Sequence, residues 1–130
     1  MRMKLVTAKL REKLLRNGAR PDADHVPVLK LFNPCGAGTW LFTELDPENP
    51  DLAFGLNDPG LGTPELGTSS LSEMAAVRLR FGLGIERDRC FTGRYPLSVY
   101  AEAARNAGHI VERGPELGAA ARSLAGVNTP

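Results

Sequence analysis

The sequence predicts a single small α+β domain, with a mostly antiparallel sheet of four or five strands, one helix before it and two or three helices after it. Three observations support this fold class. An amphipathic segment opens the chain, runs rich in strand-forming residues cluster between residues 26 and 68, and helix signals return only after residue 69. Because strands and helices do not alternate, a parallel sheet of βαβ units is not expected. A length of 130 residues with 42% hydrophobic residues suits one domain with a modest core.

The first expected element is a helix that follows Thr7, a suitable N-cap. Val6, Leu10 and Leu14 recur every four residues, so they share one face of this helix. The Asn-Gly pair that ends at Gly18 predicts a left-handed stop. A polar linker follows the helix.

Four strand-like runs come next, each bounded by glycine, proline, asparagine or aspartate. They cover residues 26–32, 39–43, 52–56 and 65–68. The first two are expected to pair as a hairpin. A fifth run, 85–91, is expected as either a strand or an extended segment, and its charges of alternating sign suit the exposed edge of a sheet.

Helix signals dominate the last part of the chain. The segment Ser70–Glu73 has the pattern of a capping box and predicts a helix that stops near Gly82. Pro96 suits the first turn of a further helix, and Gly108 suits its end. The alanine-rich segment Pro115–Leu124 predicts a short final helix.

Charge is unevenly distributed along the chain, although the net charge is only +1. Residues 31–76 contain seven acidic and no basic side chains, whereas residues 1–30 and 77–130 carry eight basic side chains each. One interpretation is that the flanking cations fold against the acidic segment and neutralise it. The other is a bipolar surface, acidic on one side and basic on the other, that steers a charged partner.

The bipolar surface favours a protein partner that binds the charged loops in the middle of the chain. The candidate residues are Glu44, Asp46, Glu48, Asp51, Asp58 and Glu65. The alternative is a nucleic-acid-binding protein that lays its basic first helix on phosphates. Its candidate residues are Lys9, Lys13, Arg16 and Arg20.

Metal, cofactor and membrane sites are not expected. The acidic residues lack the spacing of a calcium loop, and Cys35, Cys90, His25 and His109 lack the close pairs typical of zinc sites. The two G-x-G segments do not continue into a phosphate-binding motif. No apolar run is long enough for a membrane span and no signal peptide is recognised, so we expect a cytoplasmic protein.

No constellation of residues indicates catalysis, so an enzyme is not the leading hypothesis. A small hydrolase with Cys35 or the acidic cluster in its site stays as a second alternative. Cys90 stands beside Phe91 and is expected in the core, whereas Cys35 is expected in a turn.

Several segments, in this order, resemble a family of small uncharacterised bacterial proteins known only as a domain of unknown function. They are Thr39–Asp46, Phe54–Leu56, Pro64–Gly67, Ser70–Glu73 and Gly82–Asp88, with Phe91. The resemblance covers roughly residues 4–98. Members of this family are typically carried on plasmids and integrative conjugative elements.

The resemblance implies a cytoplasmic accessory protein of a mobile genetic element that binds a host-defence or transfer component. It carries no known chemistry, so it assigns no catalytic residue. The tail of this chain is longer than is usual in the family. We therefore expect an α+β domain over residues 1–98 and a C-terminal helical extension over residues 99–130, packed on the domain or trailing from it.

Overall fold

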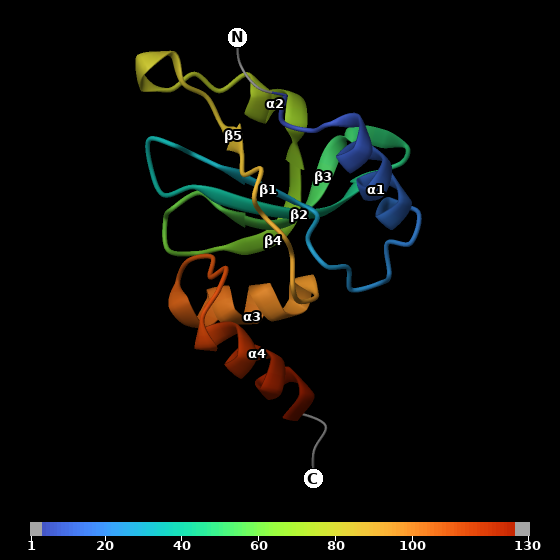
Figure 1. Cartoon of the computed structure of the whole chain (residues 1–130), viewed down its shortest axis with the longest axis vertical. Coiled ribbons are helices and arrows are strands. Elements are labelled where there is room, and N and C mark those ends of the chain that lie inside the picture. Colours follow the sequence, from blue (N-terminus) through green and yellow to red (C-terminus); the bar gives the residue numbers. More distant parts are fainter. Residues whose placement is uncertain (1–3, 127–130) are drawn as a thin grey trace.

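The computed structural model describes residues 4–126 and shows a five-stranded sheet with helices on both faces (Figure 1). In chain order the elements are α1 (Ala8–Gly18), β1 (Leu29–Phe32), β2 (Thr39–Asp46), β3 (Asn49–Asp58), β4 (Glu65–Ser70), α2 (Leu71–Ala75), the 3-10 turn η1 (Arg80–Gly82), β5 (Glu86–Arg87), α3 (Leu97–Ala107) and α4 (Pro115–Gly126). The predicted α+β fold class is confirmed.

The strands of the sheet are antiparallel and lie in the order β4-β3-β2-β1-β5. The first four strands form a meander, in which each strand pairs with the next one in the chain. The chain then passes through α2 and η1 to the other edge, where β5 pairs with β1. The predicted strand at 85–91 is thus an edge strand, although only two of its residues pair.

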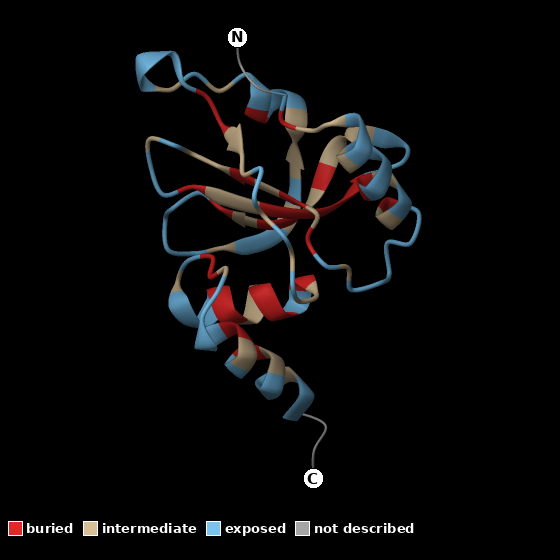
Figure 2. Ribbon diagram, in the orientation of Figure 1, coloured by how far each residue is buried: buried red, intermediate tan, exposed pale blue. Residues whose placement is uncertain are grey.

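Two hydrophobic cores, one on each face of the sheet, hold these elements together (Figure 2). On one face, Leu41 of β2 packs in a core with Tyr100 of α3. On the other face, Phe42 and Leu45 of β2 share a core with Leu14 of α1. Each of these five side chains is 1% exposed or less. The strand β2 therefore serves both cores and is the centre of the fold.

A β-bulge in β2 explains how Phe42 and Leu45 reach the same face although they are three residues apart. The pairing with β3 shifts between Phe42 and Glu44, so Thr43 is an extra residue on this strand. Strict alternation would direct Phe42 and Leu45 to opposite faces. The bulge thus keeps both large side chains in the α1 core.

Helix α1 begins where the sequence predicts, because the Thr7 hydroxyl accepts the backbone N–H of Leu10. The predicted left-handed stop is wrong. Gly18 is helical and buried, and the C-cap Ala19 is right-handed, with φ −73°. Glycine is needed at residue 18 for space, since a Cβ there would lie 1.8 Å from the carbonyl oxygen of Leu45.

The strands lie where the sequence predicts them, but their ends differ. β1 begins three residues later than expected, whereas β2 runs three residues further and β3 starts three residues earlier. The strands β2 and β3 are longer than expected because the hairpin between them closes tightly, with Asp46 paired to Asn49. The prolines of the predicted loop therefore lie in and beside a short turn.

Helix α2 is shorter than predicted. Ser70 caps it by accepting the backbone N–H of Glu73, as the capping-box pattern predicts. The helix nevertheless ends at Ala75 instead of near Gly82. The chain then forms η1, in which Phe81 has a left-handed backbone with φ 61°.

Contacts with the chain before β1 position α3. Leu97 donates its N–H to the carbonyl oxygen of His25 at 2.9 Å, and the backbone and hydroxyl of Ser98 both donate to the carboxylate of Asp24. The helix ends at Gly108 in the predicted left-handed conformation, with φ 82°. The expected boundary at residue 98 therefore falls in the first turn of a helix that packs on the sheet.

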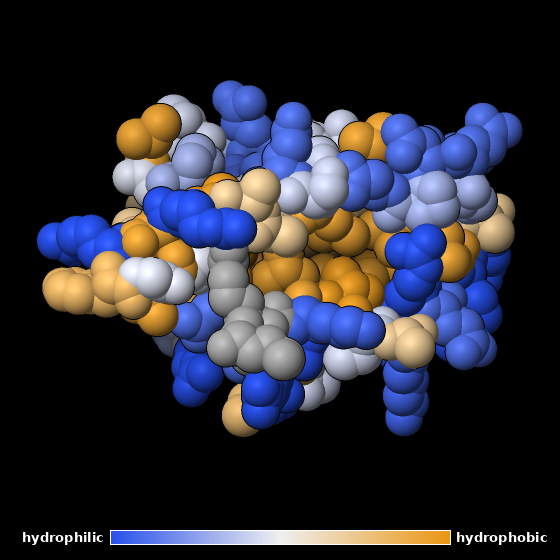
Figure 3. Space-filling view, turned by 90° about the horizontal axis from the view of Figure 1, so that it is seen from above, coloured by the Kyte–Doolittle hydropathy of each residue, from blue (hydrophilic) through white to orange (hydrophobic). Residues whose placement is uncertain are grey.

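The upper end of the molecule carries an apolar hollow. Viewed from above, hydrophobic surface gathers near the centre and is rimmed by hydrophilic side chains (Figure 3). A groove lies here between the segment before α1 and helix α2. Its lining residues are Lys4, Leu5, Val6, Leu71, Ser72, Ala75 and Arg78. None of the described residues that line this groove carries a carboxylate.

The close approach of α1 to β2 gives a direct test of the fold. We expect Gly18→Ala to destabilise the protein by about 3 kcal/mol, because its methyl group would overlap a backbone carbonyl that cannot move freely. Urea denaturation measures this. Gly67→Ala in β4 is the matched control and should change stability by less than about 1 kcal/mol, since its nearest neighbour lies 3.9 Å away. Equal effects of the two substitutions would contradict the packing of α1 described here.

Candidate functional site

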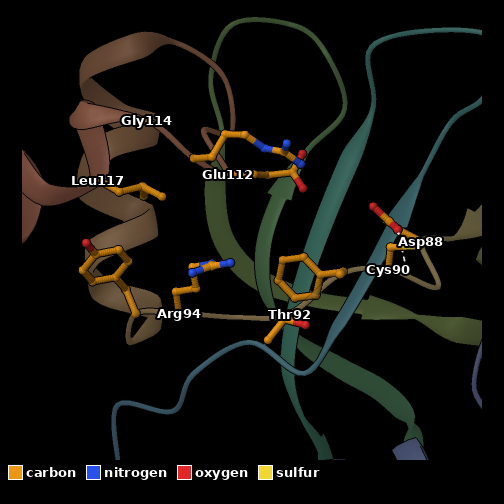
Figure 4. A pocket seen from close by; sticks show the side chains of 10 residues that line it. Asp88, Cys90, Thr92, Arg94, Glu112, Gly114 and Leu117 are labelled. Atoms are coloured by element: carbon orange, nitrogen blue, oxygen red, sulfur yellow. Dashed lines mark hydrogen bonds between the residues drawn. The ribbon is translucent and has the colours of Figure 1, made fainter.

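A cleft of about 440 Å³ opens between the loop after β5 and the connection from α3 to α4 (Figure 4). We call it the edge cleft, because β5 forms an edge of the sheet. Its volume suits a small ligand. Charged, polar and aromatic residues line it: Asp88, Cys90, Phe91, Thr92, Arg94, Tyr95, Glu112, Arg113, Gly114 and Leu117.

Lys30 of β1 joins the two walls of the edge cleft. Its ammonium group lies 3.2 Å from Asp88 Oδ2 and 2.8 Å from Glu112 Oε1. It also lies 5.7 Å from the centre of the Phe32 ring, on the same strand. The Lys30 side chain is only 14% exposed, so loss of its partners would leave a poorly solvated charge. Because Lys30 forms ion pairs with both Asp88 and Glu112, it holds the two walls of the cleft together.

A tight turn holds Asp88 in place. Its Oδ1 accepts the N–H of Cys90 at 2.8 Å, and its own N–H donates to the carbonyl oxygen of Lys30 at 3.0 Å. Burial by itself would raise the pKa of Asp88. The Cys90 N–H, the Lys30 ammonium and the Arg113 guanidinium outweigh burial and hold that pKa below its usual value of 3.8. Asp88 is therefore ionised at neutral pH.

Two arginines line the edge cleft and form no ion pair within 4.0 Å among residues 4–126. Arg94 extends into it from the wall opposite Glu112 (Figure 4), and its backbone N–H donates to the Tyr100 hydroxyl at 3.0 Å. Arg113 lines the same space. Among residues 4–126, no carboxylate lies within 4.0 Å of either guanidinium group. With Lys30 included, the cleft thus has three cations and two anions.

This arrangement suits an anion better than a metal ion. The two carboxylates of the cleft already share Lys30. Within the part of the chain that the structure describes, no three His, Cys, Asp or Glu side chains form a group that could hold a metal ion. Across the same residues, none of the helices has the length and hydrophobicity needed to cross a membrane.

The two cysteines differ from each other in burial. Cys90, predicted in the core, is exposed, because the turn at Asp88 directs only the neighbouring Phe91 toward the α3 core. Cys35 is half-buried in the turn between β1 and β2, where its N–H donates to Asn33 Oδ1 at 2.8 Å. The hydrogen bonds described for residues 4–126 do not join either thiol to a histidine, so they add no support to the hydrolase hypothesis.

The six acidic residues predicted to bind a partner do not form one surface. Glu44 and Asp58 are buried, with exposures of 9% and 2%. The Asp58 carboxylate accepts the N–H groups of Ile110 at 3.0 Å and Gly60 at 2.9 Å, so it stabilises loop backbone. Glu65 is exposed, but it pairs near the end of β3 that is remote from the β2–β3 turn.

The other three predicted acidic residues lie near one another. Asp51 is half-buried on β3 and accepts hydrogen bonds from the Ser70 hydroxyl at 2.5 Å and from Ser72 at 2.8 and 2.9 Å. These bonds lower the pKa of Asp51 from its usual 3.8 and join β3 to α2. Asp46 and Glu48 are exposed in the β2–β3 turn, and we call this pair the acidic turn.

All four predicted basic residues are exposed, and three of them lie on α1. Lys9, Lys13 and Arg16 are exposed on α1, and Arg20 is exposed just after it. The spacing of four and three residues places Lys9, Lys13 and Arg16 on one side of the helix, and Arg20 follows the C-terminal end of the helix. We call these four residues the basic stripe. Arg16 also pairs with Glu12 at 2.9 Å, but both side chains are mostly exposed, so the pair adds little stability.

Sequence reasoning did not identify the edge cleft. Its lining residues come from the segment after β5, the α3–α4 connection and α4, and Lys30 of β1, which joins its walls, lies far from them in the sequence. The charges of alternating sign at residues 86–89 predict an exposed edge. They do not indicate that Asp88 turns toward Lys30. The charge of Glu112 gave no signal at all.

Comparison with known proteins identifies the family of the chain. A family model described as a protein of unknown function (DUF2958) matches residues 5–111, which include α1, the whole sheet and α3. The predicted resemblance to a domain of unknown function is therefore confirmed. The matched segment contains Lys30 and the first wall of the edge cleft, whereas Glu112 and α4 follow it. No curated protein and no solved structure matches the chain.

The burial of Glu44 generates a pH-dependent prediction. Burial raises the pKa of Glu44 above its usual 4.5, although the Thr43 hydroxyl and His25 act in the opposite direction. The folded state therefore favours the protonated form, and stability falls as the pH rises from 4.5 through the raised pKa. Glu44→Gln, which does not ionise, should gain stability relative to the wild type between about pH 4 and pH 8.

Thermal melts at several pH values measure this gain. The control Glu65→Gln removes an exposed carboxylate and shows whether the loss of one surface charge is enough to give the same gain. If the Glu44→Gln variant follows the wild type at every pH, Glu44 does not titrate as its burial implies.

Proposed function

The chain belongs to the DUF2958 family of proteins of unknown function, and we propose that it is a non-catalytic accessory protein that binds a protein partner. The partner contacts two adjoining surfaces of opposite charge, the basic stripe and the acidic turn. Only the exposed acidic residues of the turn take part, because buried carboxylates are out of a partner's reach.

The observation that carries this proposal is the contact between the end of α1 and the end of β2. The Asn17 side chain donates to the carbonyl oxygen of Thr43 at 2.9 Å, and Gly18 packs on Leu45 and Pro47. This contact brings the end of the basic stripe beside the acidic turn. The ion pairs found within residues 4–126 nevertheless do not join the two surfaces.

Two adjoining surfaces of opposite charge fit a partner with the complementary pattern. Such a pattern increases the rate of encounter and selects one orientation, because a misplaced partner meets like charges. A DNA or RNA backbone is negative along its whole length. The basic stripe would attract it, but the acidic turn would repel it.

The proposed setting is the cytoplasm of a cell that carries a mobile genetic element, with a host-defence or transfer component as the partner. This setting follows from the resemblance of the sequence segments described above.

A second candidate function is nucleic-acid binding through the basic stripe alone. The specific observation in its favour is that Lys9, Lys13 and Arg16 are exposed on one side of α1, and that Arg20, just after the helix, is exposed too. The two functions make different demands on the acidic turn. A protein partner requires it, whereas a nucleic acid is bound better without it.

Charge substitutions at the two surfaces test the proposal. One variant combines Asp46→Asn with Glu48→Lys. The asparagine keeps the side-chain oxygen of residue 46, which accepts the backbone N–H of Glu48 at 2.9 Å. The other combines Lys13→Glu with Arg16→Glu. We expect quantitative affinity capture from the native host to lose the same proteins with both variants, by about tenfold or more.

Glu65→Lys is the matched control, since it reverses an exposed acidic residue away from the β2–β3 turn and should retain the captured proteins. A gel-shift titration across salt tests the second function with the same variants. If the stripe variant alone changes binding, and nucleic acid is the ligand retained, the proposed protein-binding function is wrong.

A further inference from the structure

We propose that the edge cleft binds a small phosphorylated ligand of the nucleoside monophosphate class, with Arg94 and Arg113 on the phosphate. This site is separate from the surfaces of the proposed function. The basic stripe lies on α1, which packs on one face of the sheet, whereas the edge cleft adjoins α3 and α4 on the other. The inference therefore does not rest on the identity of a protein partner.

The distribution of charge in the edge cleft favours an anion. Lys30 lies within 3.2 Å of both carboxylates, so Asp88 and Glu112 are already compensated. Arg94 and Arg113 remain, and in the described residues neither has a carboxylate within 4.0 Å. A guanidinium group donates two parallel hydrogen bonds to a phosphate, which makes arginine the better phosphate ligand when geometry matters.

The aromatic lining favours an organic ligand over free phosphate. Phe91 and Tyr95 both line the edge cleft and pack against the α3 core. The Tyr95 ring also makes an edge contact with Tyr100, with 6.3 Å between ring centres. These rings form an apolar wall against which a flat base can pack. The volume of about 440 Å³ is sufficient for such a ligand.

The walls of the edge cleft are fixed before any ligand binds. The Asp88 turn and Lys30 hold one wall against Glu112, and the Tyr100 hydroxyl holds the backbone of Arg94. Gly114 has φ 101°, which allows the sharp turn that brings Arg113 to the cleft before α4 begins. A preformed site loses less conformational freedom on binding, so modest contacts suffice for specificity.

Calorimetric titration of the full chain with adenosine monophosphate tests the inference. Inorganic phosphate, ribose 5-phosphate and adenosine are the comparison ligands. We expect the nucleotide to bind about tenfold or more tightly than each of the three, because only the nucleotide offers both the phosphate and the base.

The variant that combines Arg94→Ala with Arg113→Ala should weaken nucleotide binding by about tenfold or more while the thermal melt stays close to that of the wild type. Arg105→Ala on α3 is the matched control, because this arginine is 72% exposed, pairs with Glu102 and does not line the cleft. The Lys13→Glu, Arg16→Glu variant should also leave nucleotide binding unchanged, which separates this test from the test of the proposed function.

Three results would overturn the inference. The first is nucleotide binding that survives in the double arginine variant. The second is adenosine or ribose 5-phosphate binding as tight as that of the nucleotide. The third is no detectable binding of the nucleotide to the wild-type protein at millimolar concentration.

Discussion

One ammonium group, that of Lys30, connects parts of the chain that lie about 60 and 80 residues further along the sequence. It holds Asp88 after β5 and Glu112 after α3, and its side chain is 14% exposed. The strand β5 pairs with β1 over only two residues, and Ile85 just before it is buried in the α1 core. Because a poorly solvated charge requires its partners, the Lys30 network determines where the loop after β5 and the α3–α4 connection lie. The walls of the edge cleft depend on that constraint, together with the Asp88–Cys90 turn and the hydrogen bond from the Arg94 N–H to the Tyr100 hydroxyl.

The sequence predicts the fold well where the signal is local. The hydroxyl cap at Thr7, the capping box at Ser70 and the left-handed end of α3 at Gly108 were predicted from neighbouring residues and are confirmed. The prediction is wrong where a residue's conformation depends on a contact with a residue that is distant in the sequence. Gly18 looks like a helix stop, but the carbonyl oxygen of Leu45 explains why glycine is there, and no local pattern reports that contact.

The same distinction applies to function. The sequence pattern places the basic residues on one side of α1, because helical spacing is regular and needs no knowledge of the rest of the fold. It groups six acidic residues only by their proximity in the sequence. The antiparallel pairing separates them, since β3 carries Asp51 near one end and Asp58 at the other, and the bulge at Thr43 coincides with a buried Glu44. Acidic residues that are close together in the sequence therefore need not lie on the same surface of the folded protein.

A double-mutant cycle between Lys30 and Glu112 tests the central claim most directly. The variants are Lys30→Met, Glu112→Gln and their combination, and the free energy of unfolding is measured by urea denaturation. If the shared ammonium fixes the walls of the edge cleft, the coupling free energy should be about 1–3 kcal/mol. Additive effects of the two substitutions, with a coupling free energy below about 0.3 kcal/mol, would contradict the account.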